Sequence, residues 1–367
     1  MLFLTIVIFI LVISIVIISH EFFHFIVAKK TNLVVEEFCI GYPPRVFKKK
    51  IGETTYSIGL LPGGGFVKIQ GMDDSEKKES YSFYSKSLKA RFFIVLAGVM
   101  ANFLLAMILF SIGFSIGLPE AIEDEIPAGA QDIGISIVEV AENSPAQISG
   151  IKIGDKVLRI QEPISGEEKE IKEVWDVKNF TEKHLGQKLV ITLKRGNQIL
   201  EKEVLARKNP PQDEGPIGIV MVKTARISYP WYKAISKGVE NTFWLTRATI
   251  EYVLRAIMGA IIGKPLKGVE LTGPIGIGIL VSQMINLGWI YVLQFTAILS
   301  LNLAIINILP FPALDGGRLI FLFIERIRRN PINPRIENLI NNIGFVLLLI
   351  LMLIVSFQDL KRLIGLL

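Results

Sequence analysis

Four stretches of the sequence are apolar almost without interruption: residues 2–28, 92–118, 287–308 and 339–357. A helix rises about 1.5 Å per residue, so about 20 apolar residues cross the roughly 30 Å hydrocarbon core of a bilayer. The pattern therefore predicts a polytopic α-helical membrane protein with four transmembrane helices. The first two spans belong to an N-terminal membrane half, residues 1–118, and the last two to a C-terminal half, residues 287–367.

A different pattern separates the two halves. Residues 119–210 carry regular charges, alternating apolar positions and turn signals, which indicate a water-soluble domain made mostly of β-strands with short helices. Residues 211–286 form a linker, whose part from 229 to 262 is apolar but carries charged side chains at spacings of three, four and seven. This spacing draws one polar stripe along a helix, so we expect an amphipathic surface helix rather than a fifth span.

Composition and charge agree with a membrane protein. Hydrophobic residues make up 51% of the chain and charged residues only 20%. Lys29 and Lys30 follow the first span, and several arginines separate the third span from the fourth, which predicts that these loops are cytoplasmic and that residues 119–210 face outside. The net charge of +6 therefore requires no nucleic acid partner. The single cysteine, Cys39, excludes an internal disulfide and is expected to fill an apolar space.

Near its carboxyl end, the first span contains His20-Glu21-Phe22-Phe23-His24. Residues four apart share one face of a helix, so His20 and His24 can offer two imidazole nitrogens to one zinc ion, with Glu21 beside them as a base. On a surface helix such a string often arises by chance. Inside a span an ionised group costs roughly 2.5 to 3.5 kcal/mol at the bilayer centre, so the position of the motif favours a functional metal site.

A catalytic zinc site needs a third protein ligand. His184 lies among polar residues of the soluble domain and is expected to be an ordinary surface residue. Asp315 is the better candidate, because the third span ends just before it, near the cytoplasmic side of the membrane. His20 lies near the same side, because it is roughly 28 Å along the first helix from Met1. Two prolines before Asp315 and two glycines after it break the helix, as expected where the backbone lines a wet cavity. The alternative is a cap or turn residue after a span.

The motif at His20 and the stretch Asn307-x-x-Pro-x-Pro-x-Leu-Asp315-Gly resemble the motif pair of the site-2 protease family of intramembrane zinc metalloproteases. The resemblance is strongest to bacterial members that carry a PDZ domain. It implies that His20, His24 and Asp315 bind Zn²⁺, that Glu21 is the catalytic base and that Asn307 helps to hold the substrate backbone.

The same resemblance implies a biological setting. The protein would act in regulated intramembrane proteolysis in the bacterial cell (inner) membrane, with the active site near the cytoplasmic side. Its substrates would be single-span membrane proteins, for example anti-sigma factors or signal peptide remnants, already cut by an upstream site-1 protease.

Residues 119–210 are similar to one bacterial PDZ domain. The similarity rests on Asn143-Ser144-Pro145-Ala146, on Gly154-Asp155, and on an alternating strand at 188–194 followed by a turn at Arg195-Gly196-Asn197. A peptide is expected to add as a strand beside residues 135–138, with Ile133-Gly134-Ile135 as the loop that holds the end of the peptide chain. The alternative is a PDZ fold without a ligand that acts as a steric gate. Both remain open.

Residues 54–69 contain apolar runs around Gly63-Gly64-Gly65 and predict a β-hairpin. In the site-2 protease family a corresponding segment re-enters the membrane near the active site, so Phe66 and Val67 are expected to bind substrate. An unpaired strand edge there would accept an extended substrate, whose peptide bond a helix would otherwise shield. A surface hairpin beneath the bilayer is the alternative. Gly273-Pro274-Ile275-Gly276 also resembles a family motif, without an assigned chemical role.

Two functions from other classes compete with the protease. One is a catalytically inactive PDZ-bearing membrane scaffold or chaperone with a vestigial metal site, and the completeness of both motifs counts against it. The other is a metal transporter, which needs further ligands along its spans. Before the metal motif the first span offers only the hydroxyls of Thr5, Ser14 and Ser19. We therefore expect a zinc metalloprotease.

Overall fold

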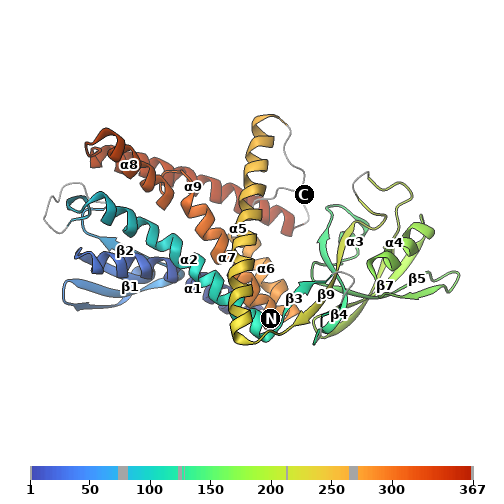
Figure 1. The fold of residues 1–367 in the computed structure, drawn as a ribbon. Coiled ribbons are helices and arrows are strands. Elements are labelled where there is room, and N and C mark those ends of the chain that lie inside the picture. Colours follow the sequence, from blue (N-terminus) through green and yellow to red (C-terminus); the bar gives the residue numbers. More distant parts are fainter. Residues whose placement is uncertain are drawn as a thin grey trace. The chain divides into compact units, whose positions relative to one another are not determined.

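The computed structural model describes residues 2–72, 82–122, 126–127, 129–211, 214–263 and 272–364. The chain forms two compact units, drawn as ribbons in Figure 1. The membrane unit comprises Met1–Ser111, Ile235–Ser282 and Leu293–Leu367. The β-rich unit comprises Ile112–Ala234 and Gln283–Val292.

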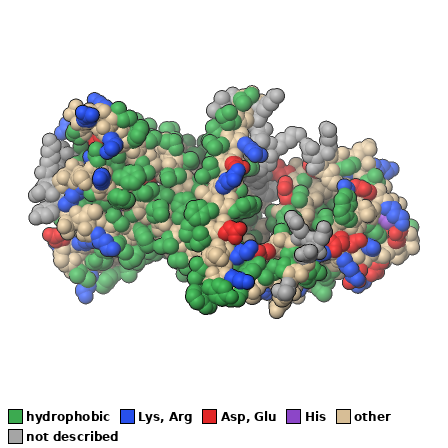
Figure 2. All heavy atoms as spheres, viewed as in Figure 1, with side chains coloured by type: hydrophobic (Ala, Val, Ile, Leu, Met, Phe, Trp, Pro, Cys, Tyr) green, Lys and Arg blue, Asp and Glu red, His purple; other side chains and the backbone are tan. Residues whose placement is uncertain are grey.

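Among the described residues, four helices are long and apolar enough to cross a membrane, as the hydrophobic pattern predicts. They are α1 (Leu2–Lys30), α2 (Leu88–Ile116), α7 (Trp289–Ile308) and α9 (Pro334–Leu363). Many of their exposed residues are hydrophobic, including Phe3 of α1 at 81% exposure and Leu353 of α9 at 65%. Figure 2 shows hydrophobic side chains over much of the visible face of the membrane unit. Such dense apolar exposure suits lipid rather than water, as in a multi-pass membrane protein.

Three other helices are less apolar or shorter: α5 (Trp231–Ile261), α6 (Pro274–Leu287) and α8 (Asp315–Arg328). Helix α5 carries charged residues along one face and is not among the four candidate spans, which agrees with the expected amphipathic helix. Helix α8 is also amphipathic. It buries Leu322 and Glu325 and exposes Ile320, Phe323 and Ile327.

Two long strands, β1 (Val35–Ile51) and β2 (Thr54–Ile69), form a small sheet that contacts α1. The chain reverses at residues 52–53, and residues 54–58 of β2 pair with residues 47–51 of β1. Residues 37–40 of β1 pair with both parts of β2, with residues 55–58 on one side and with residues 65–68 on the other, so the two parts of β2 do not pair with each other. The hairpin predicted within residues 54–69 is therefore wrong. Its glycines lie inside β2, where a Cβ on Gly65 would come 2.7 Å from the Cys39 carbonyl oxygen.

The β-rich unit is built on one antiparallel sheet with the strand order β3-β9-β4-β5-β7-β8, and β6 pairs with β5. Its strands are β3 (Leu118–Ala121), β4 (Gln131–Val140), β5 (Lys156–Gln161), β6 (Glu168–Glu170), β7 (Lys188–Arg195), β8 (Gln198–Leu205) and β9 (Ile219–Ile227). Two short helices, α3 (Pro145–Ile148) and α4 (Val174–Lys183), complete it. The core includes Ile137, Ile160 and Leu189. A mostly β domain with short helices is thus observed, and the predicted turn joins β7 to β8.

The strand order corrects two expectations about this unit. Because β9 lies between β3 and β4, the sheet continues past the expected end at residue 210 to Ile227. Strand β4 pairs with β9 along one edge and with β5 along the other, and Ile135 faces Lys223 and Val157. A peptide therefore cannot add beside residues 135–138. Ile133-Gly134-Ile135 lies within β4 rather than in a loop.

His184 is not the surface residue that its polar neighbours suggest. It follows the end of α4 and is buried at 6% exposure. Its Nδ1–H donates to the Phe180 carbonyl oxygen at 2.8 Å, so its role is structural.

The Gly273-Pro274-Ile275-Gly276 motif begins α6 and meets α9. The backbone N–H groups of Gly273 and Gly276 donate to Oδ2 of Asp359 at 3.0 and 2.8 Å, and Asp359 is only 3% exposed. A Cβ on either glycine would lie 2.8 to 3.1 Å from this carboxylate, which is too close. The motif therefore joins the amino end of α6 to α9, where the carboxylate satisfies amides that the first turn of a helix leaves unpaired.

Candidate metal centre

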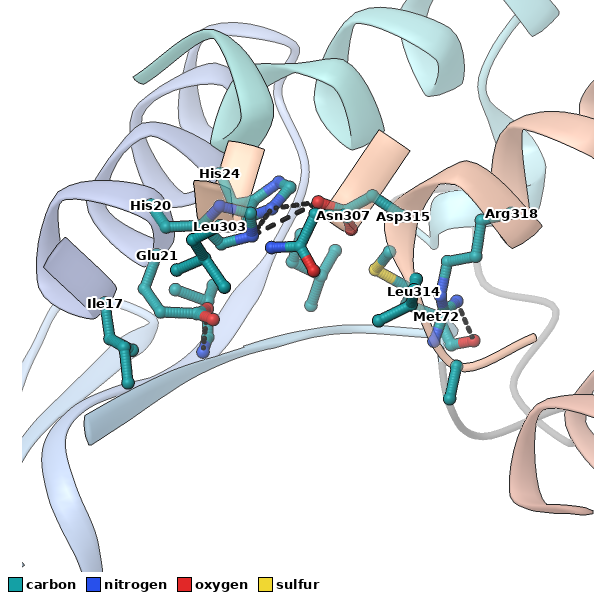
Figure 3. Close-up of a pocket in the computed structure, with 13 residues that line it drawn as sticks. Ile17, His20, Glu21, His24, Met72, Leu303, Asn307, Leu314, Asp315 and Arg318 are labelled. Atoms are coloured by element: carbon teal, nitrogen blue, oxygen red, sulfur yellow. Dashed lines mark hydrogen bonds and ion pairs between the residues drawn. The ribbon is translucent and has the colours of Figure 1, made fainter. Parts of the chain in front are cut away.

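Helix α1 places His20, Glu21 and His24 within one helical turn, inside a candidate span. Both histidines are buried at 7% exposure, although the rest of α1 faces outward over much of its length. Figure 3 shows the two imidazoles turned toward Asp315, with Glu21 beside them. The spacing of the motif therefore produces the shared face that the sequence predicts.

Asp315 is the first residue of α8 and follows a tight turn after α7. In the turn the Phe311 N–H donates to the Leu309 carbonyl oxygen at 2.7 Å, and the Ala313 N–H donates to Asn341 of α9 at 3.1 Å. A Cβ on Gly316 would overlap the carbonyl oxygens at the end of α7. The glycine therefore lets α8 begin directly against α7, and this places Asp315 beside α1.

Three potential ligand atoms converge. Nε2 of His20 lies 3.1 Å from Nε2 of His24, and Oδ2 of Asp315 lies 3.1 Å from the first nitrogen and 3.3 Å from the second. All three residues offer ligand atoms within 4.8 Å of one another. Tetrahedral zinc with Zn–N distances near 2.0–2.1 Å separates its ligand atoms by roughly 3.3 Å. The described geometry therefore fits a zinc ion bound by two imidazoles and one carboxylate, with a fourth position left open.

Helix α2 supplies the partners that orient the two imidazoles. Nδ1–H of His24 donates to the Ile94 carbonyl oxygen at 2.7 Å, so Nε2 is left free to bind a metal. Nδ2 of the Asn102 amide lies 3.4 Å from Nδ1 of His20. In this orientation the amide donates to Nδ1, and its Oδ1 is buried without a partner among the described residues. Turning the amide by 180° would place Oδ1 there to accept a hydrogen bond from Nδ1–H, which is the tautomer that leaves Nε2 of His20 free for a metal.

Gly98 lies against both rings. A Cβ at this position would come 2.6 Å from Nε2 of His20 and closer still to Nε2 of His24. Sequence reasoning missed Gly98 and Asn102. The available signal was a glycine followed one helical turn later by an asparagine, within a span that is otherwise strongly apolar.

The three candidate ligand residues and Glu21 open into a pocket of about 310 Å³. Asn307 of α7 and Arg318 of α8 also line it (Figure 3). Val67 of β2 completes this part of the lining. The Val67 N–H donates to Oε2 of Glu21 at 3.1 Å. Phe66 is not among the lining residues, because neighbouring side chains of a strand point to opposite faces. Of the predicted site residues, the structure thus brings together His20, Glu21, His24, Asp315, Asn307 and Val67.

Comparison with known proteins now gives this arrangement a context. The sequence pattern that defines peptidase family M50 matches residues 8–351. This chain belongs to peptidase family M50. A putative zinc metalloprotease of Clostridium perfringens is 33% identical to it, over 94% of this chain and 95% of that protein. Zinc metalloprotease RasP of Geobacillus kaustophilus is 28% identical, over 96% of this chain and 97% of the relative. The regulator of sigma-W protease RasP of Bacillus subtilis is 26% identical, over 98% and 99%.

Family membership establishes the class of the protein. It is a zinc metalloprotease of the site-2 protease type, and Zn²⁺ is its cofactor. The expectation of an enzyme drawn from the paired motifs is therefore confirmed. The convergence of two imidazoles, one carboxylate and Glu21 at one pocket is the arrangement that such chemistry requires.

Proposed function

We propose that this protein cleaves the transmembrane segments of single-span membrane proteins during regulated intramembrane proteolysis. The observation that carries the proposal is the location of the ligand cluster. His20 and His24 belong to a helix apolar enough to cross a membrane, and Asp315 follows the end of another such helix. Substrates that reach this cluster are themselves membrane segments. Anti-sigma factors and signal peptide remnants, shortened first by an upstream site-1 protease, are the substrates we infer.

In this proposal His20, His24 and Asp315 hold the zinc ion, and Glu21 is the general base. When bound, zinc lowers the pKa of a coordinated water and polarises the scissile carbonyl group. The Glu21 carboxylate takes a proton from the attacking water and passes it to the leaving amine nitrogen. The hydrogen bond from the Val67 N–H to Oε2 of Glu21 holds the carboxylate beside the ligand cluster.

Strand β2 offers an edge along which a substrate can be extended. Its second half pairs with β1 on one side, and the Val67 N–H points to Glu21 and hence away from β1. A substrate strand placed along this edge exposes a peptide bond that its own helix would shield. Asn307 lines the same pocket and can hold the substrate backbone from α7.

We further infer that the β-rich unit is a PDZ domain that faces outside a bacterial inner membrane and excludes substrates with bulky outer domains. If it also takes a peptide as a strand, β4 has no free edge for it. Among the described residues, the β3–β9 ladder runs from Thr224 to Ile227, and one further hydrogen bond joins the Ile122 N–H to the Lys223 carbonyl oxygen. The preceding part of β9, including Met221, borders a groove of about 440 Å³ with Trp175 of α4, and this groove replaces the one expected at residues 133–135.

The test uses full-length protein reconstituted in vesicles with a model single-span substrate. Glu21→Gln should lower the cleavage rate by about 10²- to 10⁴-fold, because proton transfer is lost. It should retain about one zinc ion per chain, because the proposed ligands are unchanged. Glu53→Gln, in the exposed turn between β1 and β2, is the matched control and should cleave normally. Equal cleavage by Glu21→Gln would exclude Glu21 as the base, and absence of cleavage by the unmodified protein would favour the scaffold.

A further inference from the structure

A groove separates the amino end of α2 from α8 in the membrane unit. Its volume is about 460 Å³. Its walls are largely apolar, with Leu88, Phe92 and Phe93 from α2 and Leu319, Leu322 and Phe323 from α8. Two cationic residues complete the lining, Lys89 on the α2 wall and Arg326 on the α8 wall. The groove is distinct from the pocket that holds the ligand cluster.

Lys89 and Arg326 are exposed, and within the described part of the chain neither makes an ion pair or a hydrogen bond. Their neighbours behave differently. Arg91, two residues after Lys89, is buried at 6% exposure and pairs with Glu325, which adjoins Arg326, at 2.5 Å. The fold thus satisfies one cation at this junction internally and leaves two cations at the groove without an anionic partner.

The groove lies where the chain is expected to leave the membrane. Leu88 is the first residue of a candidate span. Helix α8 exposes Ile320, Phe323 at 64% and Ile327 at 67%, which recur at spacings of three and four along one face and suit a helix lying in the membrane interface. Figure 2 shows Lys and Arg side chains gathered at the end of the membrane unit where α8 and the start of α2 lie, beyond a broad apolar surface.

We propose that this groove binds an anionic phospholipid. An acyl chain would lie against Phe92, Leu322 and the other apolar residues of the groove, and the headgroup phosphate would lie between Lys89 and Arg326. The charge complementarity selects this occupant, because a zwitterionic lipid brings its own cation and a soluble anion leaves the apolar walls uncovered. The geometry fits a ligand that is apolar along its length and negative at one end.

The site also has a consequence for catalysis, which rests on the proposed function. Leu319 lies one helical turn after Asp315 on α8, and α2 carries Gly98 and Asn102 against the two histidines. A lipid that fills the groove packs between these two helices and fixes their separation. Anionic lipid should therefore hold Asp315 at the ligand cluster and raise the cleavage rate.

The experiment measures binding by native mass spectrometry of the full-length Glu21→Gln protein, titrated with phosphatidylglycerol or phosphatidylcholine. The Glu21→Gln background removes turnover, so a failure of lipid binding is distinguishable from a failure of the proposed protease. Phosphatidylglycerol should bind more tightly than phosphatidylcholine. Because each basic side chain near the membrane surface contributes about fivefold to the affinity for an anionic lipid, the Lys89→Gln/Arg326→Gln variant should bind phosphatidylglycerol about 25-fold more weakly.

Two further variants control for surface charge and for folding. Arg328→Gln/Arg329→Gln removes the same charge from the same region but outside the groove, and should lose no more than about fivefold. Lys89→Arg/Arg326→Lys keeps both charges and should bind as the unmodified groove does. Glycerol phosphate, which has the headgroup without the acyl chains, should not displace the lipid.

Three outcomes would overturn the proposal. The first is equal affinity for the two lipids. The second is an equal loss of affinity in Lys89→Gln/Arg326→Gln and in Arg328→Gln/Arg329→Gln, which would indicate general surface electrostatics. The third is full displacement by glycerol phosphate, which would show that the apolar walls take no part. In vesicles of matched composition, stimulation of cleavage by phosphatidylglycerol in the groove variant as strong as in the unmodified protein would exclude the catalytic consequence.

Discussion

Gly98 of α2 provides the sharpest test of how the helices hold the ligand cluster. In Gly98→Ala the new Cβ would lie 2.6 Å from Nε2 of His20, so the ring must retreat by about 0.8 Å to reach ordinary van der Waals contact. Metal ligands tolerate displacements of only about 0.2 Å. Loss of a hydrogen-bond partner of a metal-binding histidine weakens metal binding about 10- to 100-fold. In Gly98→Ala both imidazoles are themselves displaced. We therefore expect a loss of at least about 100-fold in zinc affinity, or about 2.7 kcal/mol.

The assay is competition for zinc between the purified protein and a chelator of graded concentration, with cleavage of the model substrate measured in parallel. Alanine favours a helix by about 1 kcal/mol over glycine, so thermal unfolding of α2 should not by itself become easier. Gly278→Ala in α6 is the control, because among the described residues its Cβ meets only Phe9, at 4.0 Å. Unchanged zinc affinity and cleavage in Gly98→Ala would refute the packing argument, because the two rings would then have room to move without losing the metal.

Two other predictions concern β2 and the junction of α6 with α9. Val67→Pro removes the N–H that donates to Glu21, so cleavage should fall about tenfold with zinc retained, whereas Val67→Ile keeps the N–H and should cleave normally. Equal cleavage by the proline variant would mean that this edge is not used. Asp359→Ala leaves two amides of α6 unpaired and should lower the free energy of unfolding by about 1–3 kcal/mol, measured by thermal unfolding. Asp359→Asn keeps an acceptor oxygen and should lose less; an equal loss would show that these bonds are not the cause.

The ligand cluster was predictable because each half of it is local. His20 and His24 share a face by helical spacing alone, and Asp315 is marked by the helix-breaking residues around it. The depth argument that paired them used only helix rise and the order of the spans, and the structure brings the three residues together. Gly98 and Asn102 were not found, because in an apolar span a glycine and an asparagine are as consistent with helix packing as with a metal site.

The strand pairings were not predictable in the same way. Alternation identified β7 and the turn that follows it, but alternation does not say which strands are neighbours. The glycines at 63–65 look like a turn locally, yet the sheet uses them for a close approach of β2 to β1. Strand β9 completes the β-rich unit from beyond its expected boundary and occupies the edge of β4 that a peptide was expected to use.

The sequence by itself determined the membrane class, the four helices apolar enough to cross a membrane and the residues proposed as metal ligands, because these depend on composition and on spacing along single helices. Only the tertiary structure decided which groups orient the imidazoles and which strand edge faces Glu21. It also decided that Asp359 accepts hydrogen bonds from the glycine motif at the start of α6. Each of these is a contact between segments far apart in the chain. Such contacts depend on the packing of whole helices and strands against one another, which no local pattern of residues records.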